Sequence, residues 1–166
     1  MSAGKDPTCA ILDNGQLQCW GRNNHGQLVD GTNTHSNVPV EAGLSEFPGQ
    51  LSSGDWHSCA ILDDASLKCW GRNNEGQLGQ EHSNNIGDAA GAMGSSLSAI
   101  DLGSGRTALQ VSAGYSHTCA LLDNKQVKCW GRGDYGQLGN DSNTAKIGDN
   151  AGEMGSSLGT INLGTG

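Results

Sequence analysis

The stretch that decides the fold is CAILDDASLKCWGRNNEGQLG, residues 59–79. It occurs three times, because residues 9–28 read CAILDNGQLQCWGRNNHGQL and residues 119–139 read CALLDNKQVKCWGRGDYGQLG. Each copy places two cysteines ten positions apart, on either side of a polar turn. Repetition of one such unit at a period of 50–60 residues is typical of propellers and solenoids.

The flanks of this stretch repeat as well and divide the chain into three units. Aligning the cysteines brings together SAGKDPTCA, SSGDWHSCA and SAGYSHTCA, at residues 2–10, 52–60 and 112–120. The second and third units share a tail that the first lacks, GDAAGAMGSSLSAIDLGSG at 87–105 and GDNAGEMGSSLGTINLGTG at 148–166. We expect the third unit to lack its closing strand, and the chain to be one propeller-type domain or a fragment of one. The predicted units are 1–50, 51–110 and 111–166.

The composition favours an all-β fold with many turns. The 166 residues include 27 glycines and only three prolines, and 34% are hydrophobic. No window sustains apolar residues at helical spacing, whereas short apolar runs alternate with turns rich in Asp, Asn and Gly. The sequence therefore predicts three four-stranded repeats of a β-propeller, with buried contacts spread over several small layers rather than one central core.

The acidic charge disfavours some classes of partner. The formal net charge is -8, and the nine Lys and Arg residues are scattered along the chain. A surface of this sign repels phosphate, so we expect neither nucleic-acid binding nor insertion into membranes. No apolar run is long enough to span a bilayer, and no secretory signal is visible at the start of the chain. We expect protein partners instead, either unrelated proteins, further repeats of the same protein or neighbouring subunits of an assembly.

The polar turns are bracketed by three cysteine pairs, Cys9 with Cys19, Cys59 with Cys69 and Cys119 with Cys129. A three-residue loop at 13–15 would place Cys9 opposite Cys19, whereas a two-residue Asn-Gly turn would place it opposite Trp20. The other two copies do not decide between these registers. Zinc is disfavoured because the spacing is not C-x2-4-C and no histidine pair completes a site. We predict disulfides rather than free thiols, and hence an extracytoplasmic oxidising compartment; reduced cysteines would indicate the cytoplasm.

The sequence resembles the repeat of the regulator of chromosome condensation family. Three motifs carry the resemblance over nearly all of the chain: Gly-x-x-His-Thr/Ser-Cys-Ala-Leu, Cys-Trp-Gly and Gly-Gln-Leu-Gly. It implies β-propeller blades of four strands each. It implies that Gly54 and Gly114 form tight inner turns, and that His57 and His117 hydrogen-bond between blades, where the first unit has Pro7. It also implies tryptophan wedges between the blades, namely Trp20, Trp70 and Trp130.

The functions of that family carry over only in part. Its founding members catalyse nucleotide exchange on a small GTPase through an inserted wedge and bind chromatin through basic arms, and this acidic sequence shows neither feature. No Ser–His–Asp set can be assembled, because each histidine lies in a variable loop or at a repeat position. We predict a noncatalytic protein–protein interaction or scaffold module that binds through inter-strand loops. The alternatives are a structural subunit that cements a large extracellular or membrane-associated assembly, and a guanine-nucleotide exchange regulator.

The variable loops after Gly-Gln-Leu-Gly are the predicted binding surface, roughly at 30–50, 80–99 and 140–159. The exposed candidates in them are Phe47, His82 and Met154. Acidic side chains of these loops could offer oxygen ligands to calcium, namely Asp88, Asp149, Asn150 and Glu153. Solvated turns explain the same residues, and we favour that interpretation, so we expect no metal and no cofactor.

Overall fold

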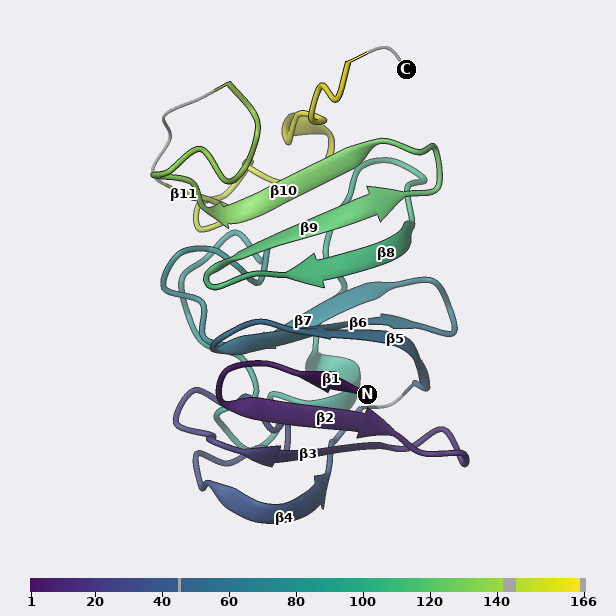
Figure 1. Ribbon diagram of the computed structural model, residues 1–166, viewed down its shortest axis with the longest axis vertical. Coiled ribbons are helices and arrows are strands. Elements are labelled where there is room, and N and C mark those ends of the chain that lie inside the picture. Colours follow the sequence, from purple (N-terminus) through teal and green to yellow (C-terminus); the bar gives the residue numbers. More distant parts are fainter. Residues whose placement is uncertain (45, 142–145, 165–166) are drawn as a thin grey trace.

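The computed structural model describes residues 1–44, 46–141 and 146–164, and its strands form three antiparallel sheets that we call blades 1, 2 and 3 (Figure 1). Blade 1 contains β1 (Ser2–Ala3), β2 (Pro7–Ile11), β3 (Leu17–Gly21) and β4 (Ser36–Glu41). Blade 2 contains β5 (Pro48–Ser53), β6 (His57–Leu62) and β7 (Leu67–Gly71). Blade 3 contains β8 (Ala108–Ala113), β9 (His117–Leu122), β10 (Val127–Arg132) and β11 (Lys146–Ile147). Two short 3-10 helices complete the described elements: η1 (Gly94–Ser96) lies between β7 and β8, and η2 (Gly155–Ser157) follows β11.

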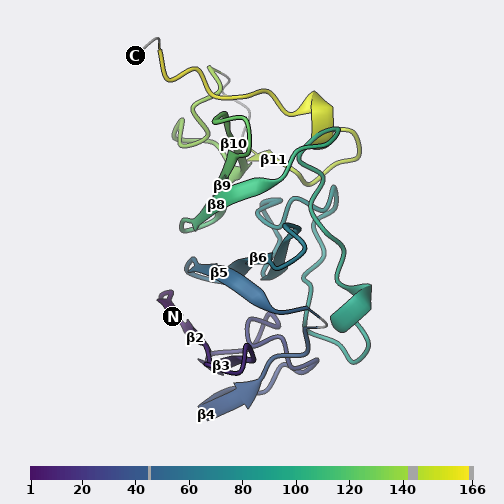
Figure 2. The same ribbon diagram turned by 90° about the vertical axis from the view of Figure 1, so that its right-hand side faces the viewer.

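The blades are arranged as a fan. Within each sheet, strands adjacent in sequence are hydrogen-bonded neighbours, so every blade is a meander. Figure 2 shows β5 and β8 on one side of the molecule and the two 3-10 helices on the other. The prediction of an all-β chain of propeller blades is confirmed. The unit limits near residues 50 and 110 stay predictions; β5 and β8 begin just before them. None of the described helices is long and apolar enough to cross a membrane.

Blade 2 has a shorter outer edge than its neighbours. Its fourth strand is reduced to one isolated bridge, in which Gly71 and Ile86 exchange backbone hydrogen bonds of 2.8 and 3.1 Å. The segment before this bridge is polar, and the residue directly after the bridge is a glycine of positive φ, Gly87 (+96°), which turns the chain away from the sheet. The chain then crosses to the preceding blade instead of extending the strand.

The core consists of two layers, one between blades 1 and 2 and one between blades 2 and 3. In β6, Cys59 and Ile61 belong to the layer between blades 2 and 3, whereas Ala60 and Leu62 belong to the layer between blades 1 and 2. Successive strand residues point to opposite faces, so a strand covered on both faces is buried along its whole length, as β6 is. The prediction of small layers in place of one central core is thus confirmed.

Candidate functional site

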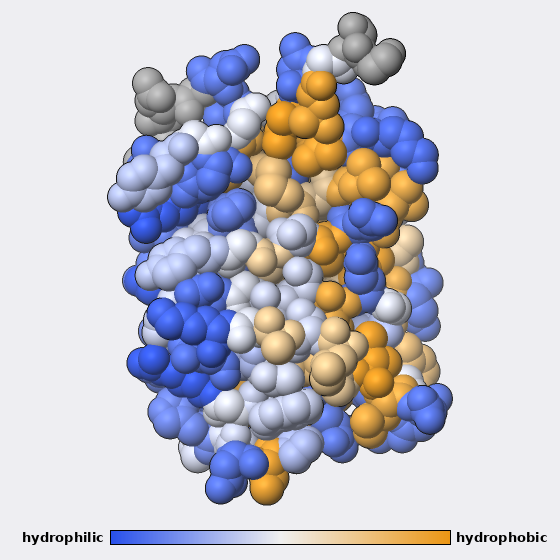
Figure 3. Space-filling view, viewed as in Figure 1, coloured by the Kyte–Doolittle hydropathy of each residue, from blue (hydrophilic) through white to orange (hydrophobic). Residues whose placement is uncertain are grey.

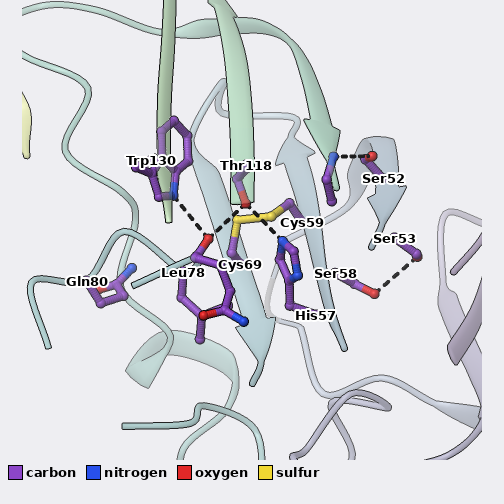
Figure 4. Close-up of a disulfide and its surroundings, with 12 residues drawn as sticks. Ser52, Ser53, His57, Ser58, Cys59, Cys69, Leu78, Gln80, Thr118 and Trp130 are labelled. Carbon is purple, nitrogen blue, oxygen red and sulfur yellow. Dashed lines mark hydrogen bonds between the residues drawn. A yellow bond between two sulfur atoms is a disulfide. The ribbon is translucent and has the colours of Figure 1, made fainter. Parts of the chain in front are cut away.

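The hairpin in the middle of each blade has the register of a three-residue loop. Leu12 N donates to Gln16 O at 2.8 Å, and equivalent bonds close the other two loops. Cys9 therefore lies directly opposite Cys19, and the alternative pairing with Trp20 is not adopted. All three cysteine pairs are disulfides, with Cα atoms 4.1 Å apart, and Figure 4 shows the one in blade 2. Each disulfide joins the two central strands of its blade.

The last residue of each hairpin loop has a left-handed backbone conformation. Its φ is +84° at Gly15, +65° at Ala65 and +68° at Lys125. Glycine adopts this conformation freely, whereas a residue with a Cβ does so at a steric cost. The second and third loops therefore make the same turn as the first, although their sequences lack its glycine.

Each blade has a forward face, turned toward the next blade, and a backward face, turned toward the preceding one; we call the contact between two such faces a joint. Trp70, on the backward face of blade 2, donates its indole N–H to Gln27 O of blade 1 at 3.1 Å. Trp130 makes the same 3.1 Å bond to Gln77 O of blade 2. Both indoles are fully buried, whereas Trp20, on the backward face of blade 1, is half-buried. Two tryptophans thus hold neighbouring blades together.

His57 lies inside the joint between blades 2 and 3 (Figure 4). Its Nε2 is 2.9 Å from Thr118 Oγ1, and that hydroxyl donates to Gln77 O at 2.8 Å. Because the hydroxyl proton is engaged, His57 Nε2 carries the proton and is the donor. Burial, with a smaller contribution from His117, lowers the pKa of His57 to about 3. The imidazole is therefore neutral at physiological pH and serves as a hydrogen-bond donor between blades.

The positions equivalent to His57 in the other blades make no such bond within the described part of the chain. His117 is half-buried on the forward face of blade 3, and burial lowers its pKa below the usual 6.5. Pro7 is buried in blade 1 and has no side-chain donor. The histidine–threonine bond between blades is therefore present at one of the two joints, the one between blades 2 and 3.

Glycines in the inner turns allow neighbouring blades to approach closely. A Cβ on Gly4 would overlap the carbonyl oxygen of Gly54, and a Cβ on Gly54 would overlap that of Gly114. The atoms nearest to a Cβ on Gly114 are those of the His117 ring in its own blade. Any side chain at Gly4 or Gly54 would therefore push two blades apart.

The tails of the second and third units fold back onto the preceding blade. Gly94 N donates to Gly43 O of blade 1 at 2.7 Å, and Leu97 is buried in the layer between blades 1 and 2. Met154 N donates to Glu81 Oε1, on the loop after β7, at 3.1 Å. These segments are parts of the joints rather than free loops. We call them the clasps, residues 86–97 and 147–158.

The loop residues predicted to contact a partner lie in different environments. Phe47 is 58% exposed. His82 is half-buried, and its Nδ1 accepts a hydrogen bond from Asn84 N at 3.2 Å. Met154 is only 4% exposed and belongs to the layer between blades 2 and 3. The expectation that Met154 is exposed is wrong, because its clasp packs against blade 2. Partner contacts by Phe47 and His82 stay a prediction.

The acidic residues considered for calcium are engaged in turns. Glu153 Oε2 accepts hydrogen bonds from the backbone N–H groups of residues 148, 149 and 150 at 2.8, 3.1 and 3.0 Å. Asp149 forms an ion pair with Lys146 at 2.9 Å, and Asp88 lies apart from both, in the first clasp. Within residues 1–44, 46–141 and 146–164, no three His, Cys, Asp or Glu side chains gather in a way that could hold a metal ion.

A cluster of basic side chains surrounds Trp56, and the sequence did not reveal it. The Arg22 guanidinium lies 4.6 Å from the ring centroid and that of Arg72 lies 5.9 Å from it, while Lys5 Nζ lies 5.5 Å away. His25 contacts the ring edge-on at 5.8 Å, and partial burial, then Arg72 and Arg22, lower its pKa. Trp56 of blade 2 thus covers an arginine of blade 1. The one signal for this cluster was the arginine that follows Cys-Trp-Gly in every copy.

Exposed apolar side chains gather at the end of the blades where the central hairpins turn. Leu12, Phe47 and Leu109 are 38%, 58% and 46% exposed. Leu12 begins the β2–β3 loop, Phe47 O accepts a hydrogen bond from Asp63 N in the β6–β7 loop, and Leu109 lies near the start of β8. Figure 3 shows apolar surface (orange) along this side of the molecule. We call Leu12, Phe47 and Leu109 the apolar row.

Comparisons with known proteins agree with this architecture. The regulator of chromosome condensation (RCC1) repeat matches residues 1–27, 50–77 and 109–137. The fold is similar to that of human WBSCR16, with a TM-score of 0.70 and 19% identity over 87% of this chain and 36% of that one. It is also similar to yeast RCC1 (Prp20) bound to Kap60, with a TM-score of 0.67 and 18% identity over 96% of this chain and 36% of that one. Because the repeat matches each of the three blades and half of all residues, the chain belongs to the RCC1 repeat family.

Proposed function

We propose that this chain is a noncatalytic protein-interaction or scaffold module that binds a protein partner through the loops at the hairpin end of its blades. The observation that carries the proposal is the apolar row, which places three exposed apolar side chains on successive blades. Single exposed apolar residues are common, but several on one side of a molecule favour an interaction surface. Leu109 lies in β8, while Leu12 and Phe47 directly adjoin β2 and β5, so strands position the row, which lowers the conformational entropy lost on binding.

Solved structures of the same fold support a protein as the partner class. Prp20 is bound to Kap60 in one structure, and a second Prp20p structure, with a TM-score of 0.67 and 18% identity, is described together with binding to Gsp1p and histones. Those partners belong to Prp20, and they support here only the use of the fold to bind proteins. The neutral, buried state of His57 supports a structural rather than a catalytic role for this histidine.

Three disulfides support an oxidising compartment as the place of action. Disulfides form and persist in secreted, cell-surface and lumenal proteins and are rare where thiols are kept reduced. The pairs join the central strands of thin blades, where hydrophobic burial alone contributes little. Isolation of the protein from its source under alkylating conditions, followed by mass analysis, tests this assignment; free thiols would contradict it.

The apolar row is tested by affinity capture with matched variants. The immobilised chain is exposed to an extract of its source, beside the double variant Phe47→Ser/Leu109→Ser and the control Tyr135→Ser. Tyr135 is 81% exposed and lies outside the row, so the control removes similar apolar area elsewhere. We expect a protein that is retained by the wild type and by the control but lost from the double variant. Equal retention by all three, or no protein above background, would contradict the proposed surface.

A further inference from the structure

Two buried lysines occupy equivalent positions in blades 2 and 3. Lys68 in β7 and Lys128 in β10 each directly precede the second cysteine of their hairpin, and they are 6% and 5% exposed. Lys68 Nζ donates to Glu46 Oε2 at 3.0 Å, so a carboxylate of the chain itself pairs with this ammonium. Buried charges are normally paired in this way, because removal from water disfavours the charged form.

The equivalent position to Glu46 in blade 3 is occupied by a cation. Pro48 in β5 and Ala108 in β8 pair with equivalent residues of the next strand, and Arg106 precedes Ala108 as Glu46 precedes Pro48. The Arg106 guanidinium forms an ion pair with Asp123 at 3.3 Å. The chain thus places an arginine where blade 2 has the counter-ion of its buried lysine.

Backbone carbonyls take up part of the Lys128 ammonium instead. Its Nζ donates to Leu102 O at 3.0 Å and to Gly155 O at 2.7 Å. An ammonium has three N–H donors, and the third has no acceptor among the described residues. Burial lowers the pKa of Lys128, and the charge of Asp101, which is itself exposed, offsets this effect only in part. The ammonium therefore retains one free donor and no hydrogen-bonded carboxylate within the described chain.

An open hollow of about 420 Å³ lies beside this ammonium, and we call it the lysine hollow. Three leucines of the layer between blades 2 and 3 line it, namely Leu102, Leu122 and Leu158. The polar side chains that line it together with Lys128 are Ser104, Arg106, Gln126, Ser156 and Thr160. Its walls come from blade 3 and from the tails of the second and third units, so it lies between two blades rather than on an end face of the chain.

The polar groups of the lysine hollow converge above Gly103. A Cβ on this glycine would lie 3.5 Å from Lys128 Nζ, 3.6 Å from Ser156 Oγ and 3.7 Å from Arg106 Cγ. These are ordinary van der Waals distances, so the point is open to an atom of a ligand. An oxygen placed near it can accept hydrogen bonds from both the ammonium and the hydroxyl, which are suitable donors to an oxyanion.

We propose that the lysine hollow binds a carboxylate, which takes the place beside Lys128 that Glu46 has beside Lys68. The Lys68–Glu46 pair, at 3.0 Å, shows how the blade accommodates such a group. One carboxylate oxygen accepts a hydrogen bond from Lys128 Nζ and the other accepts from Ser156 Oγ. The leucines of the lysine hollow cover the apolar part of the ligand, as in other small-molecule sites.

The charges around the lysine hollow favour one carboxylate over a polyanion. Asp123 pairs with Arg106 and Asp101 acts on Lys128, so binding rests on local donors and a buried charge rather than on net positive charge. The net charge of -8 repels a polyanion as well. A single carboxylate can come from an acidic side chain of a bound protein or from a small organic acid. The proposal uses none of the residues of the apolar row, so its test and that of the proposed function can fail independently.

Titration of the isotopically labelled chain with sodium acetate, followed by nuclear magnetic resonance, tests the proposal. The backbone amide signals of residues 103, 104 and 156 should shift and saturate at roughly millimolar acetate, as expected for so small a ligand. Sodium chloride at equal ionic strength should not reproduce the shifts. Lys128→Met removes the ammonium and should abolish saturation. Lys125→Met removes the same charge from the exposed hairpin loop of blade 3 and should bind acetate as the wild type does.

A second variant tests the lysine hollow without removing the buried lysine. Arg106→Glu gives blade 3 the carboxylate that blade 2 has, so it should pair with Lys128 and lower the affinity for acetate by about tenfold or more. Arg106→Gln removes the guanidinium without supplying a carboxylate, so it should lower the affinity far less. The spectra identify variants that fold, and Arg106→Glu decides the matter if Lys128→Met does not fold.

A glutamate blocked at both ends, compared with blocked glutamine, separates the two sources of the carboxylate. Tighter binding of blocked glutamate than of acetate assigns the lysine hollow to an acidic side chain of a protein, and binding no tighter than that of acetate assigns it to a free acid. The proposal is overturned if neither acid gives saturable shifts, or if chloride or blocked glutamine gives equal ones. Unchanged acetate binding by folded Lys128→Met or by Arg106→Glu, or equal loss in Arg106→Gln and Arg106→Glu, would overturn it as well.

Discussion

Acid should loosen the joint between blades 2 and 3 through a single side chain. His57 has a pKa of about 3 in the folded chain, against 6.5 for an unperturbed histidine. The unfolded chain therefore binds more protons than the folded chain between these values, so the free energy of unfolding falls as the pH drops below 6.5. At pH 5.5 the unfolded histidine is stabilised by protonation by about 1.4 kcal/mol, whereas the folded one remains neutral.

Urea unfolding at pH 8 and at pH 5.5, followed by tryptophan fluorescence with the disulfides intact, measures this loss. His57→Gln retains a hydrogen-bond donor but does not titrate, so its stability should fall by about 1.4 kcal/mol less than that of the wild type over the same interval. His117→Gln is the matched control. His117 is only half-buried, so its substitution should relieve a smaller part of the acid sensitivity.

The free energy of unfolding of each variant is compared between the two pH values, so any change in stability that the substitution causes at neutral pH cancels. If His57→Gln and the wild type lost equal stability between pH 8 and pH 5.5, the neutral, buried donor described here would be the wrong account of His57. The same conclusion would follow if His117→Gln relieved more of the acid sensitivity than His57→Gln.

Three further predictions concern the hairpins and the joints. Ala65→Gly should stabilise the protein by roughly 0.5–1 kcal/mol, because the φ of +65° at this position suits glycine. Gly15→Ala should destabilise the protein, because the added Cβ would lie 2.6 Å from the Phe47 ring. Urea unfolding of both variants and the wild type checks the sign of each change. Gly54→Ala should cost about 1–3 kcal/mol by overlap with Gly114 O, whereas Gly159→Ala, whose Cβ would meet no described atom within 4 Å, should be nearly neutral in the same assay. As reductant is added gradually, the Cys119–Cys129 disulfide should be reduced first, since Cys119 is half-buried while Cys9 and Cys59 are fully buried. Alkylation followed by peptide mass analysis gives the order in which the disulfides are reduced. Equal reduction rates for all three would contradict this prediction.

The blade could be predicted from the sequence because its determinants are local and repeated. The cysteine spacing and the polar turn indicated a hairpin and left two registers open, and the structure adopts the one that pairs Cys9 with Cys19. The sequence could not decide the register, because Ala65 and Lys125 take the left-handed conformation without being glycine. Propensity favours glycine there, but pairing of the flanking strands determines the backbone conformation of the loop.

The clasps and the Trp56 cluster depend on contacts between units, which a repeat alignment does not show. The tail that contains Met154 is rich in glycine and has little apolar periodicity, so its sequence predicted an exposed loop. Its target, Glu81, lies on another blade. Trp56 and Arg22 likewise meet across a joint, and the residue aligned with Trp56 changes from copy to copy. Sequence periodicity indicates which face of its own strand a residue lies on, but it does not indicate which residue of the neighbouring blade it contacts.

The backward reach of the clasps sets the order in which the chain can become stable as it is synthesised. Gly94 and Leu97 are needed to complete the layer over blade 1, and Met154 and Leu158 are needed to complete the layer over blade 2. The apolar face of each blade is therefore covered only after the tail of the next unit has been synthesised. A ribosome that paused after the second unit would leave blade 1 closed and blade 2 open, so maturation would proceed from the N-terminus one blade behind synthesis.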